Sequence, residues 1–91
     1  MWTGNIWIKS NGEWTQKDWD EIKQWPEVAN LWSTTGGGAW DWWLQLKPAQ
    51  TNHIDNAAKV VWKLRKKQWI IDTETWWAKE WTKETSKEWA L

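Results

Sequence analysis

Residues 35–46 read TGGGAWDWWLQL, and this stretch carries the strongest fold signal in the chain. Its three glycines provide a backbone that permits a tight reversal. The side chains that follow alternate between two faces of an expected strand over 40–47, with Trp40, Trp42, Leu44 and Leu46 on one face and Asp41, Trp43, Gln45 and Lys47 on the other. We expect this strand to pair antiparallel with a strand over 28–34. The first face suits packing on helices, whereas the second suits contact with another sheet.

A strand and a helix are predicted before this hairpin. Residues 5–9 (NIWIK) are β-branched and aromatic, and a turn-forming Ser-Asn-Gly follows them. Thr15 is expected to cap the helix, because Asp18 stands three residues later, as in a capping box. Pro26 prevents the helix from continuing.

A second helix and a fourth strand are predicted after the hairpin. Thr51 or Asn52 caps a helix that runs to about Lys67, and its apolar stripe has a 3.6-residue period: Ile54, Ala57, Ala58, Val61 and Leu64. Residues 70–79 alternate as a strand does, with Trp76 and Trp77 on opposite faces. The charged residues 81–91 form a tail that either frays or docks on a neighbour as a short helix or strand.

The element order βαββαβ predicts an α+β fold of the ferredoxin-like sandwich type. It has a four-stranded antiparallel sheet with two helices on one face and is dimeric through the other face. We expect one domain over residues 1–80, followed by the tail. A domain this small has a thin margin of stability, which association relieves. Trp43 and Trp76 are predicted at the dimer interface, and the predicted core contains Trp19, Ile22, Trp42, Leu44, Val61 and Trp62.

Composition argues against several classes of function. Twelve basic and twelve acidic residues cancel, so no basic field favours direct nucleic-acid binding. The chain has no run of 18 apolar residues and no charged leader, so we expect no membrane partner and a cytoplasmic protein. It contains no cysteine and a single histidine, His53, so we expect no metal site, no cofactor and no catalytic residues.

The aromatic composition is unusual, because the chain has fifteen Trp and neither Phe nor Tyr. The tryptophans run from Trp2 to Trp89 and fall where Phe or Tyr would ordinarily stand. A natural Trp-rich binding face would instead be clustered. The pattern therefore indicates an engineered or selected sequence in which the aromatic positions of a parent were replaced by Trp.

Three stretches together resemble one known family. They are Pro26-Glu27-Val28, Thr35-Gly36-Gly37-Gly38-Ala39-Trp40-Asp41 and Asp72-Thr73-Glu74-Thr75. With the element order, they resemble the ligand-binding RAM domain of the Lrp/AsnC transcription regulators, standing alone over about residues 4–80. We expect no helix-turn-helix ahead of this domain, unlike in the full-length members of the family. The triple glycine is one residue longer than the commonest hairpin of the family.

The resemblance implies a two-fold dimer whose sheets face each other, with further assembly possible, and an amino-acid-type effector near the hairpin. The ligand-binding positions carried over are Thr35, Gly37, Gly38 and Asp41. Glycine amides approach an α-carboxylate closely, and a carboxylate such as Asp41 accepts from an ammonium group. A purely structural interpretation stays open, in which the glycines only turn the hairpin and Asp41 caps its backbone.

Three functions follow from these observations. The first is an effector-binding and self-association module of the Lrp/AsnC type, without enzyme activity and without a DNA-binding domain. The second is an engineered fold-tolerance scaffold with no retained activity. The third is a dimeric α+β-barrel enzyme of the oxygenase type, with His53 near a pocket.

Overall fold

The computed structural model describes residues 2–35, 40–48 and 53–79. Its elements follow the predicted order, and their bounds are β1 (Thr3–Ser10), α1 (Gln16–Lys23), β2 (Val28–Ser33), β3 (Trp42–Leu46), α2 (His53–Arg65) and β4 (Ile70–Ala78). The strand predicted from residue 40 begins at Trp42 instead. β1 is longer than predicted, because β4 pairs with it from Thr3 to Ser10.

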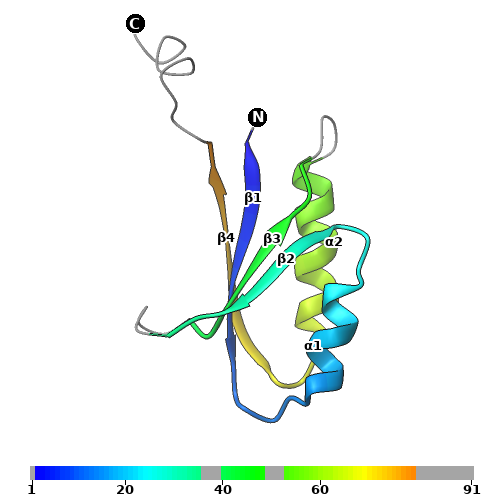
Figure 1. The fold of residues 1–91 in the computed structure, drawn as a ribbon, viewed down its shortest axis with the longest axis vertical. Coiled ribbons are helices and arrows are strands. Elements are labelled where there is room, and N and C mark those ends of the chain that lie inside the picture. The colour runs from blue at the N-terminus through cyan, green and yellow to red at the C-terminus, as the bar shows by residue number, and fades with distance from the viewer. Residues whose placement is uncertain (1, 36–39, 49–52, 80–91) are drawn as a thin grey trace, which may run out of the picture.

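The four strands form one antiparallel sheet in the order β2-β3-β1-β4, which confirms the predicted α+β, ferredoxin-like class. Both helices lie on the same face of this sheet (Figure 1). In β1, Ile6 pairs with Leu44 on one side and Thr75 on the other. Because side chains alternate along a strand, this register directs Ile6 and Leu44 toward the helices and leaves Trp7 and Trp43 on the open face.

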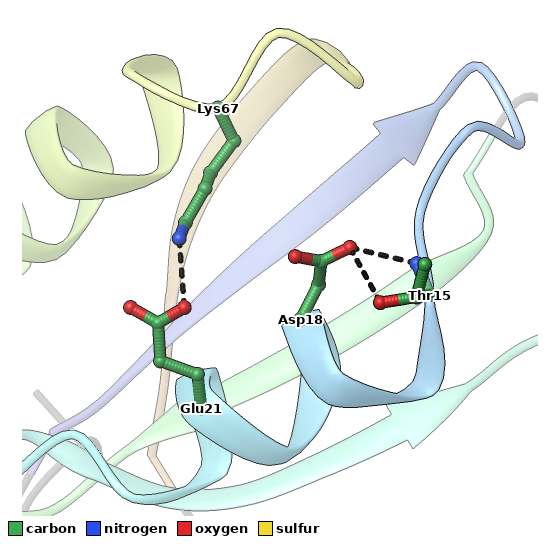
Figure 2. A network of polar contacts seen from close by, with 4 residues as sticks. All are labelled: Thr15, Asp18, Glu21 and Lys67. Atoms are coloured by element: carbon green, nitrogen blue, oxygen red, sulfur yellow. Dashed lines mark hydrogen bonds and ion pairs between the residues drawn. The ribbon is translucent and has the colours of Figure 1, made fainter.

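Polar contacts at both ends fix α1. The Asp18 carboxylate accepts hydrogen bonds from the Thr15 backbone N–H at 2.7 Å and from the Thr15 hydroxyl at 3.2 Å (Figure 2). The predicted contribution of Asp18 to a capping box is therefore confirmed. Figure 2 also shows Lys67, just after α2, bonded to Glu21 of α1 at 2.9 Å, which ties the two helical segments together.

The core lies between the sheet and the helices. Its buried apolar side chains are Ile6, Ile8, Trp19, Ile22, Val28, Leu44, Leu46, Ala57, Val60, Leu64 and Trp69. The predictions for Trp19, Ile22 and Leu44 are confirmed. Trp42 and Val61 are half-buried and pack against this core. The Trp42 ring stacks on Trp19 with 3.8 Å between centroids.

The prediction that Trp62 belongs to the core is wrong, because 65% of this residue is exposed. The apolar stripe of α2 is centred on Ala57, Val60 and Leu64 rather than on Ile54 and Ala58, which are exposed. At about 100° per residue, Trp62 lies roughly 200° around the helix from Val60 and therefore points away from the sheet. No helix in the described part of the chain is long and apolar enough to cross a membrane.

Gly4 permits the close approach of β1 to Trp77 and Leu46. A Cβ atom at this position would lie 2.8 Å from Trp77 Cζ3 and 2.9 Å from Leu46 Cδ1, closer than carbon atoms pack. We expect Gly4→Ala to lower the free energy of unfolding by about 1–3 kcal/mol, as overpacking does. Urea denaturation followed by circular dichroism measures this.

A double variant tests the cause of that loss. Trp77→Leu removes the clashing ring, so Gly4→Ala should cost less stability in the Trp77→Leu background than in the parent. Equal unfolding midpoints for the parent and Gly4→Ala would contradict the close approach.

Candidate functional site

A cavity of about 520 Å³ opens beside the predicted site residue Asp41. It lies where the loop between β1 and α1 meets the end of β2 and the start of β3. The residues that line it are Ser10, Asn11, Gly12, Trp14, Ser33, Asp41 and Trp42. This volume is within the range of small-molecule pockets.

Asp41 is fixed by hydrogen bonds from both its backbone and its side chain. Its N–H donates to the Ile8 carbonyl at 2.9 Å, and its carbonyl accepts from the Thr34 N–H at 2.8 Å. Its Oδ2 accepts from the Ser10 N–H at 2.9 Å and from the Ser10 hydroxyl at 3.4 Å. Among the described residues no hydrogen bond reaches Oδ1, so this oxygen is available to a donor in the cavity.

The loop after β1 forms another wall of the cavity. The Asn11 N–H donates to the Trp69 carbonyl at 2.9 Å, and the Asn11 side-chain oxygen accepts from the Glu13 N–H at 2.9 Å. Gly12 has a φ of +86°, a conformation that residues with a Cβ rarely adopt. These contacts hold the loop in one shape next to Asp41.

Two indole rings give the cavity an apolar side. Trp14 and Trp42 meet edge to face, with 5.3 Å between centroids and an angle of 89°. Trp42 in turn stacks on the buried Trp19, so the apolar wall continues into the core. The cavity therefore combines an aromatic surface with a carboxylate, two hydroxyls and an amide.

The structure separates Asp41 from Thr35, two of the predicted ligand-binding residues. Asp41 lines the cavity, whereas Thr35 is exposed and is not among the lining residues. Gly37 and Gly38 lie outside the described residues, as does the side chain of His53. Sequence reasoning missed the walls formed by Ser10–Gly12, Trp14 and Ser33, although the Ser-Asn-Gly turn signal marked the first of them.

A second surface lies on the open face of the sheet, where each strand contributes one tryptophan. In sheet order these are Trp32, Trp43, Trp7 and Trp76, which we call the open-face band. The distance between ring centroids is 4.4 Å from Trp32 to Trp43, 5.9 Å from Trp43 to Trp7, and 5.7 Å from Trp7 to Trp76. The rings thus form a continuous aromatic strip across all four strands. Trp43 and Trp76 lie on the face where they were predicted.

Polar groups are enclosed within the open-face band. Asn5 is 1% exposed and accepts a hydrogen bond from Trp43 Nε1 at 2.8 Å. The Asn5 amide donates to the Thr3 carbonyl at 3.0 Å. The indole Nε1 of Trp76 is buried and has no hydrogen-bond acceptor among the described residues. Such a group is costly to leave unpaired.

Comparison with solved structures supports the fold. The chain superposes on TTHA0845 from Thermus thermophilus with a TM-score of 0.68 and 23% identity, covering 90% of this chain and 98% of that one. An AsnC family transcriptional regulator from Agrobacterium tumefaciens matches with a TM-score of 0.61 and 20% identity, covering 99% of this chain and 60% of that one. The chain has the fold of these proteins.

A third solved structure is a complex with an amino acid. The transcriptional regulator NMB0573 from Neisseria meningitidis, solved as a complex with L-Met, matches with a TM-score of 0.64 and 17% identity. The match covers 87% of this chain and 50% of that one. No family model and no curated protein matches the sequence. The resemblance to Lrp/AsnC proteins is therefore supported at the level of the fold.

The role of Asp41 in the fold can be separated from its charge. We expect Asp41→Ala to lower the free energy of unfolding by about 1–2 kcal/mol, because the Ser10 N–H loses its acceptor. Asp41→Asn should lower the free energy of unfolding by less, since the amide oxygen can accept the same hydrogen bond. Urea denaturation of the two variants measures both effects. Parent-like stability of Asp41→Ala would show that the bond to Ser10 does not support the fold.

Proposed function

We propose that this chain is a small-molecule-binding and self-association module that senses an amino-acid-type effector and carries out no chemistry of its own. The observation that carries the proposal is the cavity that joins the fixed carboxylate of Asp41 to the aromatic wall of Trp14 and Trp42. The chain shares its fold with a regulator solved with L-Met, which supports an amino-acid-type effector.

The chemistry of the cavity favours a ligand with an ammonium group and an apolar side chain. Asp41 Oδ1 can accept from the ammonium group while Oδ2 remains bonded to Ser10. The two indole rings provide the surface for the side chain. The Ser33 and Asn11 side chains offer donors for a carboxylate.

Titration of the ¹⁵N-labelled chain with L-methionine and other free amino acids tests effector binding. The expected result is saturable shifts of the Ser10–Gly12 amide signals and of the Trp14 and Trp42 indole signals. Asp41→Asn removes the charge but keeps an acceptor for Ser10, so it should weaken binding at least about tenfold.

Asp72→Asn is the matched control, because Asp72 is exposed on β4 and is not among the residues that line the cavity. It should bind the effector as the parent does. If neither amino acids nor simple amines shift the cavity signals, the sensing function is wrong.

We further propose that two copies associate through the open-face band. The helices cover the other face of the sheet, and a continuous strip of four indole rings is an unusual surface to leave in water (Figure 1). A partner sheet would cover the rings.

Sedimentation velocity tests the association. The parent should sediment as a species of twice the 11.0 kDa chain mass. Trp32→Glu places a charge in the band at its most exposed ring and should shift the chain toward monomer. Trp62→Glu makes the same change on the outer face of α2 and should leave the dimer intact. A monomeric parent, or equal effects of the two variants, would contradict this interface.

A second candidate is the engineered fold-tolerance scaffold. It is favoured by the buried Trp19 Nε1, which has no hydrogen-bond acceptor among the described residues. A phenylalanine there would leave no such group, as expected where an indole replaces the aromatic side chain of a parent. The titration distinguishes the two candidates, because a scaffold without retained activity binds no effector.

A further inference from the structure

The outer face of α2 carries an exposed apolar stripe. Ile54 and Trp62 are 66% and 65% exposed, and Ala58 stands between them, also exposed. The spacing of four residues places the three side chains along one side of the helix. This stripe faces away from the sheet and is separate from both the cavity and the open-face band.

The stripe is bordered by positive charge. Residues 54–67 contain five Lys or Arg residues and one carboxylate. Lys63 and Lys67 form ion pairs with Glu27 and Glu21. Among the described residues, Lys59, Arg65 and Lys66 have no carboxylate within 4.0 Å.

A cation also stands directly on the exposed indole ring. Lys66 Nζ lies 3.6 Å from the centroid of Trp62. A segment that docks on this indole therefore meets an ammonium group beside an apolar surface. The stripe suits an apolar segment that carries carboxylates.

The chain itself contains such a segment after β4. Residues 80–91 read EWTKETSKEWAL, with Glu80, Glu84 and Glu88 spaced by four and with Trp81 and Trp89 as large apolar residues. In helical spacing the glutamates would form one row and Trp81, Thr85 and Trp89 the adjacent row. This pattern is complementary to the stripe, in which apolar residues at the same spacing lie next to cations.

The position of the end of β4 allows the segment to reach the stripe. Trp77 of β4 and Asn56 in the first turns of α2 line one small cavity of about 140 Å³. The end of β4 and the start of α2 lie at the same end of the molecule (Figure 1). Residues 80–83 can span about 13 Å when extended, and a helix over residues 84–91 would be about 12 Å long, within the roughly 16 Å from Ile54 to Arg65.

We propose that residues 80–91 dock on the Ile54–Ala58–Trp62 stripe of the same chain, with their glutamates toward Lys59, Arg65 and Lys66. Docking covers an exposed apolar surface and supplies carboxylates to cations that have none among the described residues. It leaves the open-face band accessible to a second copy.

NMR of the ¹⁵N-labelled full chain tests the docking. The indole signal of Trp62 is assigned by its loss in Trp62→Phe. Glu84→Lys with Glu88→Lys reverses the charge of the segment, and a chain that ends at Lys79 removes it. Both changes should move the Ala58 amide and Trp62 indole signals in the same direction, while the Trp32 indole signal stays in place. High salt should weaken the difference between the parent and the charge-reversed chain.

A matched variant and a dilution series complete the experiment. Lys83→Glu with Lys87→Glu makes the segment more acidic, so the α2 signals should move opposite to those of the charge-reversed chain or remain as in the parent. Identical α2 signals in the parent, the charge-reversed chain and the shortened chain would overturn the proposal. Loss of the difference on dilution would also overturn it, because it would assign the docking to a second copy. If the shortened chain does not fold, the charge-reversed full chain decides alone.

Discussion

β1 is hydrogen-bonded along both edges, and the position of every other element depends on it. On one side it pairs with β3 and on the other with β4, and these two ladders set which side chains face the helices. Ile6 and Ile8 are fully buried on one face, while Trp7 lies on the other. A shift of one residue would exchange the two faces and place the isoleucines in the open-face band. The bonds of Asp41 to Ile8 and Ser10 help to fix this register.

The register also explains how so many indole rings fit into a small domain. The rings are divided between two layers rather than gathered in one core. Trp19 of α1 and Trp69 are buried in the core, and Trp42 extends that group to the cavity. Trp7, Trp32, Trp43 and Trp76 occupy the opposite face, where ring size is not limited by a covering helix. Trp62 lies in neither layer, because it is exposed on the outer face of α2. This division reduces the overpacking that a single core would suffer.

Sequence signals within a few residues predicted the helices and strands well. They predicted contacts between residues that are distant in the sequence poorly. The alternation around Leu44 identified the two faces of β3, and Asp18 marked the start of α1, because both signals lie within a few residues. In α2, Ala57, Ala58, Val60 and Val61 are all apolar, so periodicity alone did not decide which pair faces the sheet, and Trp62 was placed in the core. The bond between Ser10 and Asp41 joins residues 31 positions apart and depends on the pairing of β1 with β3. The glycines drew attention to the hairpin, whereas the described walls of the cavity come largely from the loop after β1.

The proposed effector site and the proposed association surface meet in β3. Trp42 lines the cavity, and its neighbour Trp43 belongs to the open-face band, because successive side chains of a strand point to opposite faces. A ligand that contacts Trp42 and Asp41 therefore touches the strand that holds the centre of the band. Trp43 also donates a hydrogen bond to Asn5 of β1, which links β3 to its neighbouring inner strand. The sheet thus provides a short structural connection between binding on one face and assembly on the other, whereas the outer face of α2 shares no lining residue with either surface.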